Sequence, residues 1–299
     1  MGHIITDLKE AFRRGNVYIQ LIFINVGVFV ITTLIGILLQ LFNRSAAGIF
    51  ELLALPASFT RFAWQPWSIF TYMFMHAGFL HILFNMLWLY WFGALFLYFF
   101  SGKHLRGLYI VGGICGGLLY MISYNVFPYF RPMTVYSTMV GASASVLAIV
   151  VATAYREPNY PVRLLFFGNV RLKYLALIVV LTDLLFITSS NAGGHIAHLG
   201  GALAGLWFAA SLNKGKDITS WVNKALDAIA ALFSAKTWKR KPKMKVHYGN
   251  NTRQNDYDYN ARKKAQSDEI DRILDKLKKS GYESLTTEEK KSLFDASKR

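Results

Sequence analysis

Long apolar segments within the first 212 residues constrain the fold more than any other feature. A helix needs about 20 mostly apolar residues to cross the hydrocarbon core of a bilayer. Hydrophobic residues make up 54% of this 299-residue chain, too many for an ordinary soluble domain of that length. Six segments approach or exceed the spanning length: 17–42, 80–100, 105–126, 140–155, 173–188 and 195–212. The sequence therefore predicts an all-α membrane protein with six transmembrane helices.

Positive charges in the connections predict the orientation in the membrane, because cytoplasmic loops carry an excess of Lys and Arg. With the N-terminus in the cytoplasm, the inner connections hold nine such residues and the outer connections hold Arg44, Arg61 and Arg131. The run 17–42 is too long for the core of a cleaved signal peptide, so we expect it to remain as a signal-anchor. Both termini are then cytoplasmic.

The net charge of +16 raises the question of an anionic partner. Lipids of the inner leaflet attract basic residues as nucleic acids do. Because apolar helices accompany the charge, we interpret it as contact with the lipid bilayer and expect no nucleic-acid partner. Cys115 is the single cysteine, which excludes an intramolecular disulfide.

Polar residues occur at a similar depth in three of the expected helices. His81 and Asn85 lie near the start of the second helix, Ser143 near the start of the fourth and His198 near the start of the sixth. These three helices all run inward, so the four side chains lie toward the outer leaflet. Arg156 marks the inner end of the fourth helix. Ser143 precedes it by thirteen residues, so the serine lies roughly 20 Å of helix above that end. Polar side chains inside a membrane are costly and commonly functional.

These residue types suit acyl transfer. A serine hydroxyl becomes nucleophilic when a histidine removes its proton, which favours Ser143 and His198 as a catalytic dyad. A tetrahedral oxyanion needs donors, which His81, Asn85 and the backbone at the start of a helix can supply. No acid in the apolar helices is placed to complete an obvious triad. Any one of these residues alone is more often structural; the combination carries the prediction.

Three further polar residues receive other interpretations. His76 and His81 are about 140° apart on an ideal helix, so His76 is expected in the loop or at the start of the helix. Asp183 lies inside an apolar span, and we favour a structural hydrogen bond over a role in helix movement or substrate admission. His195 shares a helix face with His198, and we favour a solvated position over support of that residue.

Three sequence motifs together resemble the rhomboid family of intramembrane serine proteases. They are HILFN at 81–85, GASA at 141–144 and AHLGGALAG at 197–205. The resemblance covers about 17–212. It implies Ser143 as the nucleophile and His198 as general base and acid.

The same resemblance assigns supporting roles. His81 and Asn85 would stabilise the oxyanion with the backbone N–H of Ser143. His76 would order the first outer loop, Gly141 would serve a structural role, and Gly201 and Gly205 would pack the sixth helix on the fourth. The implied substrates are transmembrane proteins, cut near the outer end of a helix, with no cofactor and no metal. The implied location is a bacterial inner membrane, with the active site open to the outer side.

The chain departs from the common family pattern at three places. Ala144 follows the nucleophile where many members have Gly, and Trp67-Ser68 stands where Trp-Arg is frequent. Leu147 occupies a position from which some members stack an aromatic ring on the catalytic histidine.

Four regions follow from composition. We expect an N-terminal cytoplasmic segment at 1–16, the six-helix core at 17–212 and a basic amphipathic helix at 213–245. That helix is predicted to lie on the membrane surface, with docking on protein as the alternative. Residues 246–299 are expected to form a flexible linker and a small helical hairpin at 268–296, which docks a protein partner, regulates the core or only solubilises the chain.

Two other functions stay open. A catalytically silent rhomboid-like protein would bind transmembrane clients without cutting them. Four histidines near one membrane face could instead ligate haem or a metal, as in membrane cytochromes. That interpretation leaves Ser143 and Asn85 unexplained.

Overall fold

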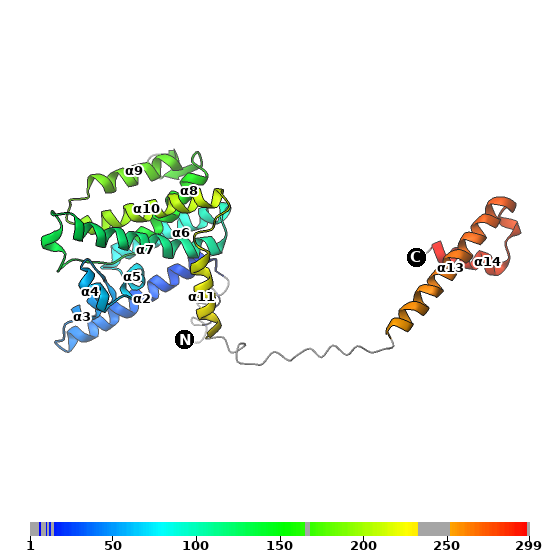
Figure 1. Ribbon diagram of the computed structural model, residues 1–299, viewed down its shortest axis with the longest axis horizontal. Coiled ribbons are helices and arrows are strands. Elements are labelled where there is room, and N and C mark those ends of the chain that lie inside the picture. The colour runs from blue at the N-terminus through cyan, green and yellow to red at the C-terminus, as the bar shows by residue number, and fades with distance from the viewer. Residues whose placement is uncertain are drawn as a thin grey trace. The chain divides into compact units, whose positions relative to one another are not determined.

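The computed structural model describes residues 6, 10, 12, 15–164, 168–232 and 252–297. It divides into two compact units, Met1–Thr237 and Trp238–Arg299. Each unit is helical apart from two short antiparallel strand pairs in the first (Figure 1).

Each of the six apolar segments forms a helix in the first unit. The helices are α2 (Val17–Leu41), α6 (Phe79–Phe99), α7 (Gly102–Val126), α8 (Ser143–Arg156), α9 (Leu172–Leu185) and α10 (Ala192–Asn213). In the described part of the chain, four of them (α2, α6, α7 and α10) are long and apolar enough to cross a membrane. Helices α8 and α9 have 14 residues each, or about 21 Å, less than the ~30 Å of a bilayer core. The chain is thus a multi-pass membrane protein with four helices of spanning length in its described part.

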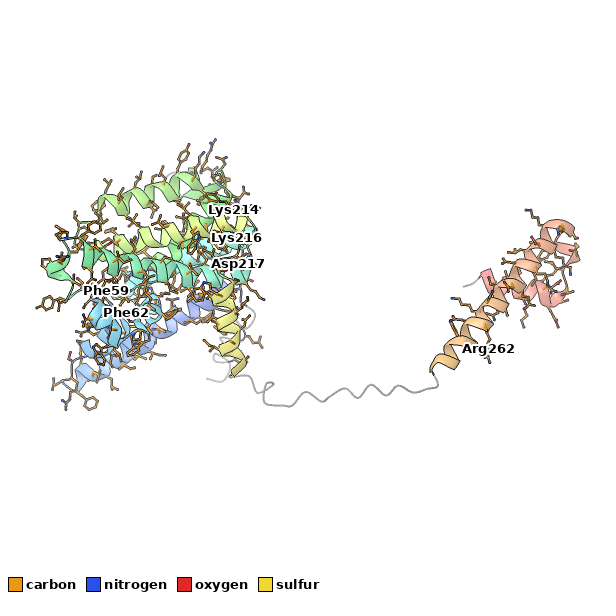
Figure 2. All side chains as sticks on the ribbon, in the orientation of Figure 1. Phe59, Phe62, Lys214, Lys216, Asp217 and Arg262 are labelled. Atoms are coloured by element: carbon orange, nitrogen blue, oxygen red, sulfur yellow. The ribbon has the colours of Figure 1, made fainter. Side chains whose placement is uncertain are left out.

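Apolar side chains project outward from the peripheral helices (Figure 2). Ile31 and Leu34 on α2 are 59% and 60% exposed, and Ile178 on α9 is 59% exposed. A soluble protein rarely leaves a continuous surface of this kind facing water. Contact with lipid accounts for it.

Helix α8 is the buried centre of the unit, since every residue from 144 to 154 is buried. Helix α10 lies directly against it: a Cβ atom at Gly201 would overlap the carbonyl oxygen of Ala144, and one at Gly205 would overlap that of Ala148. On α7, a Cβ at Gly112 would come 2.5 Å from the Cβ of Ala148. Small residues let helix backbones approach in a membrane, where no hydrophobic effect drives helices together. Three helices therefore pack backbone to backbone around the start of α8.

The connection between α2 and α6 is structured. It holds α3 (Ala47–Leu53), β1 (Leu55–Pro56), α4 (Phe59–Trp64), α5 (Ser68–Thr71) and the 3₁₀ turn η1 (Tyr72–Phe74). Strand β1 pairs with β2 (Thr138–Met139), which immediately precedes α8. Arg61 bonds Glu51 at 2.7 Å, and Nε1 of Trp67 donates to the carbonyl of Leu52 at 2.9 Å. These contacts anchor the loop that contains the Trp67-Ser68 departure.

Two further connections complete this unit. The 3₁₀ turn η2 (Arg131–Met133) precedes β2, and the hairpin of β3 (Pro161–Leu164) and β4 (Gly168–Arg171) joins α8 to α9.

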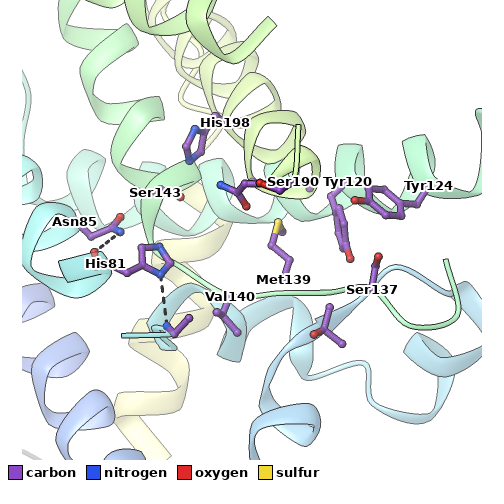
Figure 3. A pocket seen from close by; sticks show the side chains of 15 residues that line it. His81, Asn85, Tyr120, Tyr124, Ser137, Met139, Val140, Ser143, Ser190 and His198 are labelled. Carbon is purple, nitrogen blue, oxygen red and sulfur yellow. Dashed lines mark hydrogen bonds between the residues drawn. The ribbon is translucent and has the colours of Figure 1, made fainter. Parts of the chain in front are cut away.

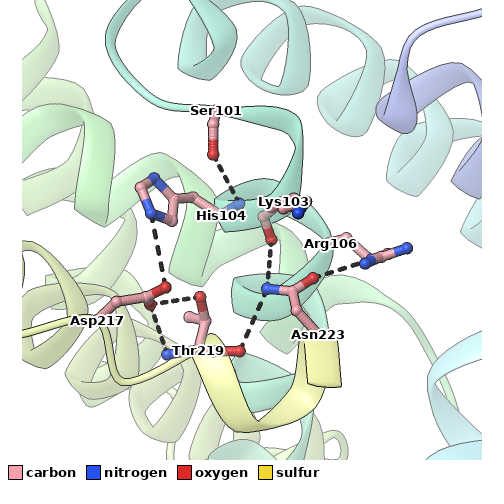
Figure 4. A network of polar contacts seen from close by, with 7 residues as sticks. All are labelled: Ser101, Lys103, His104, Arg106, Asp217, Thr219 and Asn223. Carbon is pink, nitrogen blue, oxygen red and sulfur yellow. Dashed lines mark hydrogen bonds and ion pairs between the residues drawn. The ribbon is translucent and has the colours of Figure 1, made fainter. Parts of the chain in front are cut away.

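Helix α11 (Ser220–Leu232) lies in the region where the sequence favours a membrane-surface helix over a docked one. In the structure its first turns dock on α7 through polar contacts (Figure 4). Nδ2 of Asn223 donates to the carbonyl of Lys103 at 3.0 Å, and Arg106 donates to Oδ1 of Asn223 at 3.0 Å and to Asp227 at 2.9 Å. Trp221 remains 54% exposed. The basic stretch 236–245 lies outside the described residues.

The second unit is a helical hairpin of α13 (Thr252–Ser280) and α14 (Thr287–Ser297), joined by the 3₁₀ turn η3 (Tyr282–Ser284). Gly281 ends α13 with a φ of +78°, a conformation that favours glycine. The backbone N–H of Thr286 donates to Glu289, whose own N–H donates to the hydroxyl of Thr286, so the two residues form a capping box. The helix begins at Thr252, within the expected linker, and the good helix formers Ala, Arg, Lys and Gln at 261–266 favour its continuation there.

Candidate active site

Four of the polar residues singled out in the sequence line one cavity. His81 and Asn85 of α6, Ser143 of α8 and His198 of α10 border a space of about 530 Å³ (Figure 3). An adjoining apolar cavity of about 210 Å³ shares Asn85, Ser143 and His198, and Leu147 is part of its wall. The two cavities therefore meet at the serine and the histidine.

Ser143 is the first residue of α8, where backbone N–H groups have no acceptor within the helix. Gly141 precedes it with a φ of +136°, and its N–H donates to the carbonyl of Tyr72 at 2.9 Å. A Cβ atom at Gly141 would lie 2.9 Å from Nε2 of His81 and 3.6 Å from Oγ of Ser143. The turn thus brings the hydroxyl and the imidazole to the same small space, and a side chain at 141 would fill it.

The hydrogen bonds of His81 and Asn85 orient both as donors. The N–H of Ala77 lies 3.5 Å from Nδ1 of His81, so Nδ1 is the acceptor and Nε2 carries the proton. Nδ2 of Asn85 donates one proton to the carbonyl of His81 at 2.8 Å and keeps a second. Both residues can therefore offer an N–H to an anion in the cavity.

His76 lies in the loop before α6, outside the cavity wall. It is buried, and its ring meets that of His81 edge-on with the centroids 5.1 Å apart. Loss of hydration, together with the nearby His81, lowers the pKa of His76 from 6.5 to about 4. His76 is therefore neutral at physiological pH, a packing partner for His81.

His198 has a partner that sequence reasoning missed. Nδ1 of His198 and Nδ1 of His195 each lie 2.8 Å from Oδ1 of Asp183, a residue of α9 that is only 3% exposed. The sequence places no acid for an obvious triad and favours a solvated position for His195, whereas the structure gives both histidines a buried carboxylate partner. The three-residue spacing of His195 and His198 indicated that both side chains lie on one face of the helix. Only the packing of α9 against α10 shows that Asp183 contacts both of them.

The same three side chains offer ligand atoms that all lie within 4.8 Å of one another, the kind of set that can hold a metal ion. Two imidazoles and a carboxylate are zinc ligands by type. Ligand atoms about 2.0–2.1 Å from one tetrahedral zinc ion stand roughly 3.3 Å apart. The observed 2.8 Å from oxygen to each nitrogen is instead a hydrogen-bond distance.

The serine hydroxyl makes no hydrogen bond to His198 among the described contacts. Catalytic hydrogen bonds often tighten only once substrate is bound. The cavity is also lined by polar residues outside the three motifs, which carried no sequence signal: Tyr120, Tyr124, Ser137, Thr138, Ser190 and Asn191.

Residues 63–214, about half of the chain, match the family model of the rhomboid domain. The chain belongs to the rhomboid family. All three motifs lie inside the matched region, and so do α6–α10 and the cavity. Helices α2 and α11 lie outside the rhomboid match.

A curated rhomboid relative is also similar. RHOMBOID-like protein 12, mitochondrial, of Arabidopsis thaliana is 29% identical over 158 residues, which cover 50% of this chain and 47% of that protein. The chain thus matches about half the length of this relative. Residues 254–299, which make up most of the second unit, match a different family whose function is unknown, DUF6576. The rhomboid domain is therefore joined to a separately recognised C-terminal module.

Proposed function

We propose that this protein is an intramembrane serine protease that hydrolyses peptide bonds in or near transmembrane helices of membrane proteins. The observation that carries the proposal is the convergence of Ser143, His198, His81 and Asn85, from three helices, on one cavity. Family membership supports it, since rhomboid motifs coincide with that cavity.

The chemistry follows from the positions of the side chains. Oγ of Ser143 attacks the scissile carbonyl while Nε2 of His198 takes its proton, and His198 then protonates the leaving amine. The oxyanion accepts hydrogen bonds from the backbone N–H of Ser143, Nε2–H of His81 and the free N–H of Asn85. Water, activated by His198, hydrolyses the acyl-enzyme. No cofactor or metal takes part in this sequence of steps.

The proposed membrane arrangement has six spans, both termini in the cytoplasm and the cavity open to the outer side of a bacterial inner membrane. The shortness of α8 supports a submerged site: a 14-residue helix that reaches the inner surface must begin below the outer one. The strands and turns before Ser143 then fill the outer part of the membrane and admit water. The partners are the lipid bilayer, transmembrane substrates and, for the C-terminal hairpin, another protein.

Purified protein in lipid vesicles, incubated with a model membrane-spanning substrate, tests the activity. We expect cleavage by the parent chain and none by Ser143→Ala or His198→Ala. A fluorophosphonate probe should label Ser143 in the parent only. Failure of the parent, where an active relative cuts the same substrates in the same vesicles, would instead favour a silent client-binding protein.

A further inference from the structure

The carboxylate of Asp183 makes its two contacts through one oxygen. Oδ1 lies 2.8 Å from Nδ1 of His198 and 2.8 Å from Nδ1 of His195, while Oδ2 is buried and has no hydrogen-bond partner among the described residues. A buried carboxylate is stable only when it is paired or hydrogen-bonded. The two imidazoles are therefore the groups that hold Asp183 in place, and Asp183 in turn holds them.

The contact decides which nitrogen of His198 carries the proton. An ionised carboxylate only accepts hydrogen bonds, so Nδ1 of His198 must be the N–H donor. In the neutral ring Nε2 then has the free lone pair. That tautomer is the one able to take a proton from a serine hydroxyl, and His198 borders both cavities that Ser143 borders.

We propose that Asp183 is a positioning residue that completes a Ser143–His198–Asp183 triad, with His195 bonding the same carboxylate oxygen and helping to fix it. The inference rests on the proposed protease function and deepens it. Asp183 holds the imidazole in the Nδ1–H form and, when Nε2 gains the serine proton, stabilises the resulting imidazolium. The acid reaches the site from α9, whereas the nucleophile and base come from α8 and α10, so three neighbouring helices build the triad.

The test uses the full chain in lipid and compares Asp183→Asn with the parent. Asparagine keeps the shape but can offer an N–H to Nδ1, which favours the wrong tautomer. We expect kcat to fall roughly 100-fold or more with little change in KM. Asp183→Glu retains the charge and should recover part of the loss. Thr182→Val is the matched control on α9, because the Thr182 hydroxyl is exposed and its one bond within the described part of the chain goes to the carbonyl of Ile178 in the same helix.

A readout independent of activity separates this inference from the proposed function. In protein labelled with ¹⁵N-histidine, with the His198 signals identified through His198→Gln, the parent should show a protonated Nδ1. Asp183→Asn should move that proton toward Nε2. If the parent cuts no substrate, the proposed function fails, and the tautomer measurement still decides whether Asp183 positions His198.

Two results would overturn the inference. One is an unchanged tautomer in Asp183→Asn, with any activity loss matched by a lower melting temperature, as expected of a purely structural residue. The other is a stoichiometric metal ion in the purified protein whose removal by a chelator reproduces the loss of activity, since Asp183 would then be a ligand. A lost kcat with an unchanged melting temperature, a shifted tautomer and no bound metal would support it.

Discussion

The backbone of Gly141 lies so close to the ring of His81 that a Cβ atom there would come within 2.9 Å of Nε2. The same residue has a φ of +136°, which side-chain-bearing residues rarely adopt. The turn before Ser143 therefore requires glycine at 141 for two reasons. The backbone conformation is one that favours glycine, and the missing side chain leaves room for the imidazole of His81.

Gly141→Ala should consequently impair catalysis more than stability. We expect kcat to fall about 10- to 100-fold, because His81 and the N–H of Ser143 no longer face the same point, and the free energy of unfolding to fall by about 1–2 kcal/mol. Substrate cleavage and thermal unfolding in lipid measure both. Gly78→Ala is the control, since a Cβ there meets nothing within 4 Å and φ is extended. Equal activity of the two variants would contradict the argument.

Burial of His76 predicts a pH dependence of stability. The unfolded residue takes up a proton below pH 6.5, whereas the folded one does so only near pH 4. Stability should therefore decline as the pH falls from 6.5 to 4, by ~3 kcal/mol at most, and this contribution should be constant above and below that window. Denaturation at a series of pH values should show a shallower decline for His76→Phe. A comparison at pH 8 isolates the change in packing, and parallel curves for both proteins would refute the assignment.

Close packing of α10 on α8 predicts that Gly201→Ala is severe. The new methyl group would overlap the carbonyl oxygen of Ala144, a backbone atom that cannot move alone. We expect a loss of about 2–3 kcal/mol and a loss of cleavage, because His198 and Ser143 move apart as the helices separate. Gly27→Ala on α2 is the matched control, since no atom of another described segment lies within 4 Å of its Cβ position. Wild-type melting and activity for Gly201→Ala would show that the helices do not pack this closely.

The docking of α11 predicts a local effect of Asn223→Ala. The substitution removes the hydrogen bonds to the carbonyl of Lys103 and from Arg106, at a cost of about 1–2 kcal/mol, without touching the cavity. We expect faster hydrogen exchange and faster proteolysis within α11, with cleavage of substrate unchanged. The neighbouring Lys224 is exposed, so Lys224→Ala should leave α11 protected. Equal protection in both variants would mean that α11 is held by other contacts.

The sequence by itself determined which segments form helices and which polar residues line the shared cavity. The expected segment 80–100 became Phe79–Phe99 and 195–212 became Ala192–Asn213, since long apolar stretches and their polar ends are local properties of the chain. Order and direction along the chain were enough to predict that Ser143 and His198 share a depth. The motifs around them predicted the family that the comparison with known domains then showed.

Only the tertiary structure decided which side chains meet. Asp183 is fifteen residues from His198 along the chain, and their contact depends on how α9 and α10 rotate about their axes, which periodicity does not specify. The face of α11 that docks on α7 could not be predicted for a similar reason. Asn223 bonds the backbone carbonyl of Lys103, and no sequence pattern indicates which backbone carbonyl a side chain will meet. Local pattern determines which segments become helices, whereas the partner of a buried polar group depends on non-local packing.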